Sequence, residues 1–175
     1  MIRLVAFIRG INVGGRIVKK VELQKAFTAL GFRRVVTHKQ SGNVIFETAD
    51  ANLAELGTKI ESMLRNELGF DVSVFIRTFP QLKSLVEHNS RKVSEGDSLL
   101  VTLLAGPIDA HALPLPLTIP KSTAKIFSAS GSEVFSLTHG GGEGALPNPF
   151  LESRLKVKAT TRNMNVLREI LEKYG

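Results

Sequence analysis

The sequence predicts an α+β protein, with a ferredoxin-like βαββαβ subdomain over residues 1–78 packed with a second, smaller α+β subdomain over residues 79–175. Strand-like and helix-like apolar patterns follow one another in the order strand, helix, strand, strand, helix, strand. The 175 residues suffice for one domain or two small halves. With 43% hydrophobic and 22% charged residues, the composition is that of a globular protein.

The first elements follow directly from the apolar periodicity. Residues 2–9 (IRLVAFIR) predict a buried strand, and residues 10–20 (GINVGGRIVKK) predict a glycine-rich loop. Apolar residues at helical spacing between 21 and 30 predict the first helix, which should stop at Gly31 in the left-handed conformation.

The next segments complete the βαββαβ pattern. Residues 32–48 predict a hairpin that turns at Ser41 and Gly42. Residues 51–68 carry one apolar stripe and predict a helix that Asp50 precedes and Gly69 follows. Residues 70–77 (FDVSVFIR) predict the fourth strand.

The second half has a less regular pattern. Thr78 and Gln81 have the spacing of a capping box and open a helix, and a polar linker (88–98) leads to a strand (99–105). A proline-broken connection follows over 106–120, and a hairpin is expected over 124–130 and 133–137. The chain closes with a helix whose apolar face includes Leu167 and Ile170.

The predicted topology places two distant segments at one sheet edge. In a βαββαβ unit with right-handed crossovers, the first and third strands lie side by side in the centre of an antiparallel sheet. The end of the first strand at Arg9, the glycine-rich loop and the turn at residues 40–43 then share an edge with the start of the first helix. A helix N-terminus offers unpaired N–H groups and a partial positive charge.

Basic residues are segregated along the chain, whose total charge is +7. Residues 1–46 contain nine Lys or Arg and one acidic residue, residues 47–152 contain eight basic and thirteen acidic residues, and residues 153–168 contain five basic residues and no acid. The asymmetry favours an anionic partner, either nucleic acid or a phosphorylated ligand. Charges that only maintain solubility are the alternative.

Several classes of chemistry are excluded or disfavoured. The absence of cysteine excludes thiol catalysis and Cys-ligated zinc, and the four histidines lack metal-ligand spacing, so we expect neither metal nor cofactor. Gly10 to Gly15 has the spacing of a phosphate-binding P-loop, but Arg16 and Ile17 replace its Lys and Ser or Thr. An RNA-recognition surface would need exposed rings where Ser41 and Asn43 lie, whereas Phe46 should face the core.

We also expect neither a secretory signal peptide nor a membrane-spanning helix. Arg3 and Arg9 interrupt the N-terminal apolar stretch, and no apolar run is long enough to span a membrane. We expect a cytoplasmic protein with no membrane partner, and we favour a monomer.

Three segments, RGINVGG (9–15), QSGNVIF (40–46) and ATTRNMN (159–165), resemble the signature segments of the bacterial family called domain of unknown function 1697. The resemblance covers essentially the whole chain and implies two α+β subdomains, the first ferredoxin-like, with no established activity or cofactor. The third segment of the family usually reads TTRNWN, and Met164 replaces its tryptophan here. A methionine can still fill an apolar gap.

These observations together define a candidate ligand-binding set. We expect its last five members at or near the start of the final helix, a second natural anion site. The set is Arg9, Gly10, Asn12, Gly14, Gly15, Gln40, Ser41, Gly42, Asn43, Thr160, Thr161, Arg162, Asn163 and Asn165.

The hypothesis is that these residues line one cleft that binds an anionic ligand. A metal-free enzyme acting on a small phosphorylated or carboxylated metabolite is the alternative function, although the motif segments lack the titrating group that acid–base work needs. Polar residues of these types also satisfy loops and lock subdomains together, so a structural seam is the third reading.

Overall fold

The structure is a computed structural model that describes residues 1–12, 14–39, 42–89, 93–109, 112–140 and 146–175. The chain divides into two compact units. Unit 1 comprises Met1–Leu85 and Lys173–Gly175, and unit 2 comprises Val86–Glu172. The sequence predicts a boundary between the two subdomains at residues 78 and 79. In the structure the chain divides between Leu85 and Val86, inside the helix that begins at Phe79. In the described ranges no helix has both the length and the apolar character that crossing a membrane requires.

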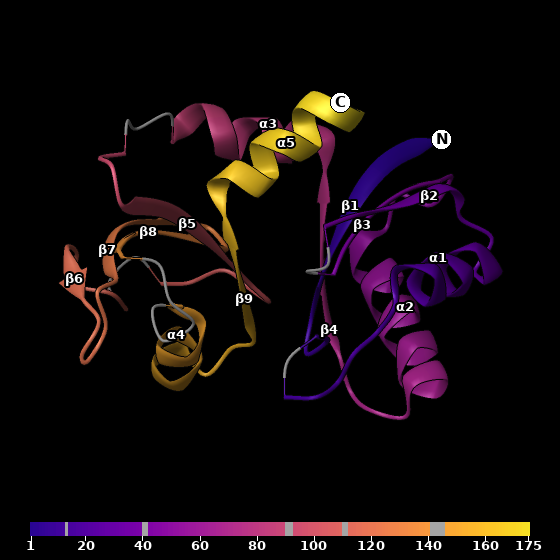
Figure 1. Cartoon of the computed structure of the whole chain (residues 1–175), viewed down its shortest axis with the longest axis horizontal. Coiled ribbons are helices and arrows are strands. Elements are labelled where there is room, and N and C mark those ends of the chain that lie inside the picture. The colour runs from indigo at the N-terminus through magenta and orange to yellow at the C-terminus, as the bar shows by residue number, and fades with distance from the viewer. Residues whose placement is uncertain (13, 40–41, 90–92, 110–111, 141–145) are drawn as a thin grey trace. The chain divides into compact units, whose positions relative to one another are not determined.

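Unit 1 has the ferredoxin-like topology that the sequence predicts. Its elements are β1 (Ile2–Arg9), α1 (Lys20–Ala29), β2 (Arg33–His38), β3 (Asn43–Thr48), α2 (Leu53–Leu68) and β4 (Ser73–Thr78). They build a four-stranded antiparallel sheet in the order β2-β3-β1-β4, with β1 and β3 central. Figure 1 shows α1 and α2 on the same face of this sheet.

The two faces of this sheet carry different side chains because successive residues of a strand point to opposite sides. Leu4, Ala6 and Ile8 of β1 face the helices and pack in the core of unit 1, which includes Phe46, as predicted. Val5 and Phe7 point to the other face and are also buried.

The ends of the helices show which sequence signals act. Gly31 has a φ of +85° directly after the C-cap of α1, and Gly69 ends α2 with a φ of +75°. The N-cap of α2 is Asn52, whose side chain accepts from the Glu55 N–H (3.3 Å), and Asp50 precedes the helix as expected. The Asp50 side chain accepts from the Asn52 N–H (2.9 Å) and so supports the N-cap residue from two positions earlier.

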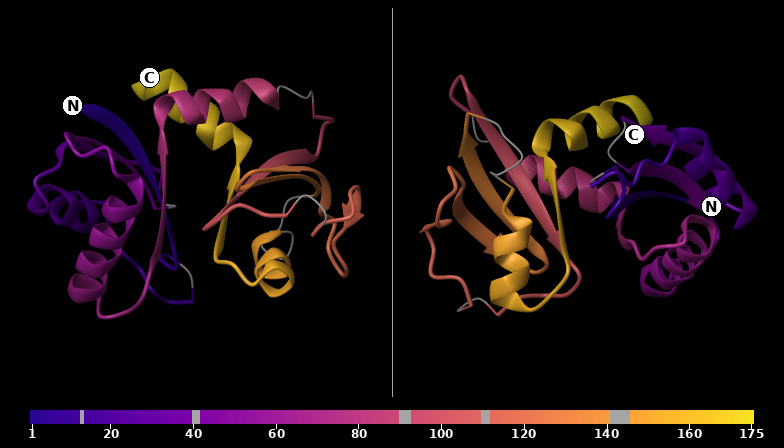
Figure 2. Two further views of the ribbon diagram at one scale, coloured as in Figure 1. Left: turned by 180° about the vertical axis from the view of Figure 1, so that it is seen from behind. Right: turned by 60° about the horizontal axis from the view of Figure 1, so that its bottom comes forward.

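Unit 2 contains a second antiparallel sheet. The remaining elements are α3 (Phe79–His88), β5 (Asp97–Leu104), β6 (Leu117–Thr118), β7 (Lys125–Ser130), β8 (Glu133–His139), α4 (Asn148–Leu155), β9 (Ala159–Asn163) and α5 (Met164–Tyr174). Helices α3 and α5 each run across the division between the units. The sheet order is β6-β7-β8-β5-β9. Figure 2 shows α4 against this sheet, where Leu151 packs in a second apolar core.

Most elements of the second half match the expected ones. The capping box at the start of α3 is present, because Thr78 N–H donates to Gln81 Oε1 (2.8 Å) and Gln81 N–H donates to Thr78 Oγ1 (3.2 Å). The predicted strand at 99–105 and the hairpin after residue 124 correspond to β5, β7 and β8. Three elements were not predicted: β6, α4 and β9.

Candidate functional site

The glycine-rich loop and the β2–β3 turn lie at the same edge of the unit 1 sheet, as the topology predicts. Ile8 N–H donates to the Gly42 carbonyl oxygen (2.7 Å). Gly42 has a φ of +70°, and a Cβ there would lie 2.9 Å from both the Ile8 carbonyl oxygen and Ile11 Cδ1. Glycine is therefore required where the two segments touch. Gln40 and Ser41, both in the candidate set, lie outside the described residues.

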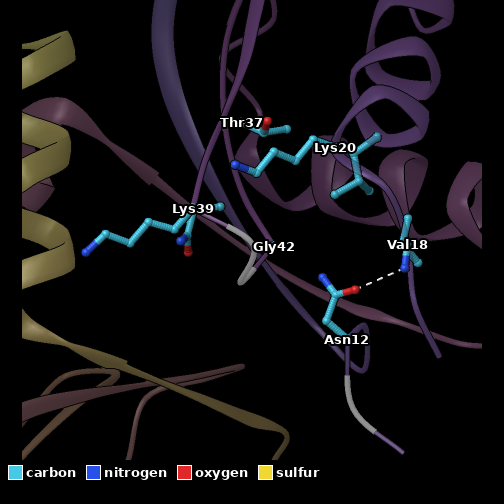
Figure 3. A pocket seen from close by; sticks show the side chains of 8 residues that line it. Asn12, Val18, Lys20, Thr37, Lys39 and Gly42 are labelled. Atoms are coloured by element: carbon cyan, nitrogen blue, oxygen red, sulfur yellow. Dashed lines mark hydrogen bonds between the residues drawn. The ribbon is translucent and has the colours of Figure 1, made fainter. Parts of the chain in front are cut away.

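Asn12 holds the glycine-rich loop in shape. Its N–H donates to the Arg16 carbonyl oxygen (2.6 Å), and its Oδ1 accepts from the Val18 N–H (3.0 Å). Asn12 has a φ of +56°, a conformation that Asn tolerates better than most residues. Because Oδ1 faces Val18, the amide nitrogen of Asn12 turns the other way, toward Gly42 and Lys20 (Figure 3). The exposed tip of this loop contains Gly14 and Gly15, both with positive φ.

A small pocket lies between this loop, the first turn of α1 and the β2–β3 turn (Figure 3). The space between its lining residues is about 200 Å³ with open solvent included, and it is too narrow to hold a water-sized sphere. We call it the edge pocket. Its lining residues are Asn12, Val18, Lys20, Leu23, Thr37, Lys39, Gly42 and Asn43. Polar groups on one side and the core residues Val18 and Leu23 on the other give it a mixed lining.

Two lysines are among the lining residues of the edge pocket. Lys20 is the first residue of α1, and its side chain extends toward Thr37, while the Lys39 side chain extends away from Lys20 (Figure 3). Lys39 has a φ of +55°, a backbone conformation that side chains other than Asn and Asp rarely adopt. Both lysines are exposed. Sequence analysis missed them as site residues, although both adjoin the motif segments that it singled out.

The start of α1 lies beside the edge pocket as expected, but its anion position is partly filled. The carboxylate of Glu22 accepts from the Lys19 N–H (2.9 Å). A negative side chain in the first turn also complements the helix dipole. The positive charge available to a ligand therefore comes from the lysine side chains more than from the helix end.

Three other candidate residues are held in place by their surroundings in unit 1. Arg9 lies on the sheet face opposite α1 and α2, across from Ser73 on β4, and is half-buried. Asn43 is buried, and its Nδ2 donates to the His38 carbonyl oxygen (3.1 Å), which closes the β2–β3 turn. Gly10 has a φ of +91°, and a Cβ there would approach the Asp71 carbonyl oxygen at 3.5 Å.

Four of the five candidate residues of the third motif segment lie in a strand that ends directly before α5, and Asn165 is the second residue of α5, so the segment lies at the start of the final helix, mostly as a strand that was not predicted. Thr160, Thr161, Arg162 and Asn163 belong to β9, paired with β5. Strand alternation sends Thr160 and Arg162 to one face of the sheet and Thr161 and Asn163 to the other. One segment therefore cannot present all four side chains to one ligand.

Hydrogen bonds hold the side chains on both faces of this strand. Thr161 Oγ1 donates to Asn148 Oδ1 (3.3 Å) and lies 2.9 Å from Thr102 Oγ1. Arg162 Nη1 donates to Thr160 Oγ1 (2.8 Å) and to the Thr161 carbonyl oxygen (2.9 Å). Burial lowers the pKa of Arg162 to about 10.

The residues at the start of α5 also have partners within unit 2. Asn163 Oδ1 accepts from the Asn165 N–H (2.9 Å), as a cap does at a helix start. Exposed Asn165 accepts from Arg168 through its own Oδ1 (2.9 Å). Met164 is fully buried, so it fills apolar space as the sequence analysis allowed. The two groups of candidate residues belong to different units, and their joining in one cleft stays a prediction.

A histidine–carboxylate pair lies in unit 2, and the sequence analysis did not find it. His139 Nδ1 and Asp97 Oδ1 are 2.6 Å apart, because antiparallel pairing of β5 with β8 brings these strand ends together. The His139 side chain is 75% exposed. A sequence separation of 42 residues gives no signal for this pair until the strand register is known. Within the ranges that the structure describes, no three His, Asp or Glu side chains gather as a metal site would need.

Comparisons with known proteins identify the family. The family model described as "Protein of unknown function (DUF1697)" matches residues 1–135. No curated protein sequence matches the chain. A solved structure, the conserved bacterial protein SP0830 from Streptococcus pneumoniae, is similar with a TM-score of 0.68 and 22% sequence identity, and the match covers 98% of this chain and 97% of that one. This likeness supports the α+β fold, and the match to the family model shows that the chain belongs to the DUF1697 family.

Proposed function

We propose that the protein is a cytoplasmic binding protein for an anionic ligand, which unit 1 holds in the edge pocket. The observation that carries the proposal is the charge of the described lining, which contains Lys20 and Lys39 and no carboxylate. Asn12 and Thr37 add an amide and a hydroxyl that can donate hydrogen bonds. Such a lining complements an anion and disfavours a cation.

The charge of the surrounding sequence also favours an anionic ligand. Residues 1–46 contain nine basic side chains and a single acidic one, Glu22. Glu22 is engaged with the Lys19 N–H. A surface of one sign raises the local concentration of oppositely charged ligands and speeds their association.

Thermal unfolding in phosphate and in chloride of equal ionic strength tests the proposal. A ligand that binds only the folded state stabilises it by RT ln(1 + [L]/Kd), so at a given concentration the tighter ligand raises the melting temperature more. We expect phosphate to raise the melting temperature of the wild type, and the rise to be smaller for Lys20→Gln. Lys25→Gln is the matched control, because Lys25 is exposed on the same helix and does not line the pocket. Equal responses of the two variants would show that phosphate acts on overall charge and would refute a site in the pocket.

A metal-free enzyme is the second candidate function, and the Asp97–His139 pair favours it. A carboxylate that holds Nδ1 of a histidine orients the ring and leaves Nε2 to act as a base. This pair is the kind of titrating group that the motif segments lack. Hydrolysis of small phosphate and carboxylate esters by the wild type, absent in His139→Gln and kept in His88→Gln, would support an enzyme. Equal rates in all three proteins would refute it.

A further inference from the structure

Exposed cations lie at both ends of the pair that α1 forms with β2, the edge strand of the unit 1 sheet. Residues 30–32 join the end of α1 to the start of β2, so Arg33 lies at the end of the helix and Lys20 at its beginning. The ten residues of α1 span about 15 Å. We call Lys19 and Lys20 the helix-start group, and Arg33 and Arg34 the strand-start group. The two basic groups are therefore about 15 Å apart.

A bulge in β2 exposes both residues of the strand-start group. In a regular strand, successive side chains point to opposite faces, so one of two neighbouring arginines would point toward the helices. The register of β2 against β3 shifts between Arg33 and Val36, and Arg34 has a φ of +48°. Both arginines are exposed, and the Arg34 side chain is 74% exposed although its Nη1 lies 3.4 Å from Glu47 Oε1. The bulge therefore turns two neighbouring guanidinium groups to solvent.

These cations have little neutralisation by acidic side chains. Among the described residues, no carboxylate forms an ion pair with Lys19, Lys20 or Arg33. Glu22 is the single acid of residues 1–46, and its carboxylate accepts from the Lys19 backbone N–H instead of pairing with an ammonium group. The surface along α1 and β2 therefore complements an anion.

The separation of the two groups favours a polymer over a small anion. One phosphate or carboxylate is far shorter than about 15 Å, so it can contact one group at a time. A double helix has one negative charge per about 1.7 Å of its axis, and about 15 Å of it contains roughly nine phosphates. An extended acidic peptide of that length has at most about five side chains, at about 3.3 Å per residue. Charge density therefore favours nucleic acid over an acidic peptide.

The aromatic side chains of unit 1 indicate which form of nucleic acid fits. Proteins that bind single strands stack the bases on open aromatic faces. A double helix keeps its bases stacked and presents its phosphates outward, so it needs no such ring. Five rings of unit 1 are buried, namely Phe7, Phe27, Phe32, Phe46 and Phe75.

Each remaining ring of unit 1 is half-buried and has a cation over one face. The Arg16 guanidinium lies 5.0 Å from the centroid of Phe70, which also packs against the core. Arg3 lies 5.9 Å from the centroid of Phe79, and the Lys173 ammonium lies 5.4 Å from that of Tyr174. In the part of unit 1 that the structure describes, therefore, no ring offers an open platform for a base.

We propose that the surface formed by α1 and β2 binds the backbone of double-helical nucleic acid, with the helix-start group and the strand-start group on separate phosphates. The inference rests on the proposed function, since Lys20 also lines the edge pocket, and it names the anionic partner. A guanidinium can bind a phosphate through two parallel hydrogen bonds, and a lysine acts as a point charge. Contacts of this kind position a duplex without reading its sequence.

Fluorescence anisotropy with the full-length protein tests the proposal. The probes are a DNA duplex and an RNA duplex of about 20 base pairs, their single strands, and polyglutamate of the same total charge as a duplex. We expect a duplex to bind more tightly than the single strands or polyglutamate. Its affinity should fall about 150-fold between about 50 and 200 mM salt, as four phosphate contacts predict with a slope of about −0.9 each. A preference between the duplexes shows which helical form fits the surface.

Variants identify the surface. Arg33→Gln combined with Arg34→Gln should make the salt slope shallower by about 1.8, and Lys20→Gln by about 0.9, because fewer counterions are released. The matched control combines Lys59→Gln with Arg65→Gln. It removes two charges from α2, whose three glutamates outnumber its two cations, and it should leave the slope unchanged. All five positions are exposed, and the melting temperature verifies that the variants fold.

The results that overturn this inference differ from those that overturn the proposed function. Single strands or polyglutamate that bind as tightly as a duplex, or an equal loss of slope in the α2 control, would overturn the duplex surface. If no duplex binds but phosphate still raises the melting temperature through Lys20, the inference is wrong and anion binding stands. If phosphate has no such effect either, the proposed function is wrong as well.

Discussion

The sheet edge of unit 1 and the β9 segment of unit 2 both contain motif residues, but different physical features hold them. At the edge, backbone conformation is decisive: Gly42 and Asn12 both have positive φ, and a Cβ at Gly42 would lie 2.9 Å from the Ile8 carbonyl oxygen. In β9, side chains are decisive, because Thr161 lies in a buried hydroxyl network with Thr102 and Asn148. A glycine can thus be required by backbone geometry alone, and a threonine next to a helix start can be buried in a strand.

The largest expected effect is at the edge, and it tests whether backbone conformation governs there. Gly42→Ala should reduce the free energy of unfolding by about 3 kcal/mol or more, since the new Cβ would meet backbone and side-chain atoms at 2.9 Å in a strained conformation. Urea unfolding measures the change. Gly14→Ala is the matched control, because Gly14 also has positive φ but open space around its Cβ position, and about 1 kcal/mol is expected. Equal losses would mean that the close contact is unimportant.

The hydroxyl network of unit 2 should respond less strongly and in a different pattern. Thr161→Val should cost about 2 kcal/mol, because it leaves the fully buried Thr102 hydroxyl without its partner. Thr102→Val should cost about 1 kcal/mol, since Thr161 keeps Asn148. The double variant should cost less than the two single changes together, and exposed Thr118→Val should change little. Strictly additive costs in the double variant would show that the two hydroxyls do not interact.

This comparison also explains how much the sequence could predict. Unit 1 was predictable because its strands and helices alternate with clear periodicity, and the βαββαβ topology then forces the loop after Arg9 toward the turn before Asn43. The exclusion of Phe46 as a stacking ring followed from the same alternation. Lys20 and Lys39 were missed because the lining of a pocket depends on side-chain direction, which periodicity does not provide.

The strand formed by residues 159–163 was missed because threonine and asparagine are ambiguous. Both residue types favour helix starts, and a real helix begins at Met164, one residue after Asn163. The same residues can continue a strand when a neighbour such as β5 supplies the ladder, and that pairing is set by tertiary structure. The Asp97–His139 pair was missed for the same reason, since register brings the two residues together.

The smallest expected effect lies toward the other end of β3, where charge instead of backbone conformation acts. Glu47 Oε1 accepts from Arg3 Nε (3.2 Å) and Nη2 (3.0 Å), and Arg34 Nη1 lies 3.4 Å away. The hydrogen bond from Arg3, with the charges of Arg34 and Arg3, holds the pKa of Glu47 below its usual value of 4.5. A carboxyl with a lowered pKa in the folded state adds stability above its unfolded pKa, and this stability disappears as the pH falls through the folded value.

Acid titration of stability therefore distinguishes the two ends of β3. Below about pH 4.5, the wild type should lose stability with the uptake of at most about one proton at Glu47, and Glu47→Gln should remove that part of the slope. Glu67→Gln, at an exposed carboxylate on α2, should leave the slope unchanged. Gly42→Ala should shift the whole curve down without changing its slope, because no titrating group is involved. If Glu47→Gln and Glu67→Gln give the same acid slope, the two arginines do not hold Glu47 in its charged form, and this end of β3 is held by its strand pairing alone.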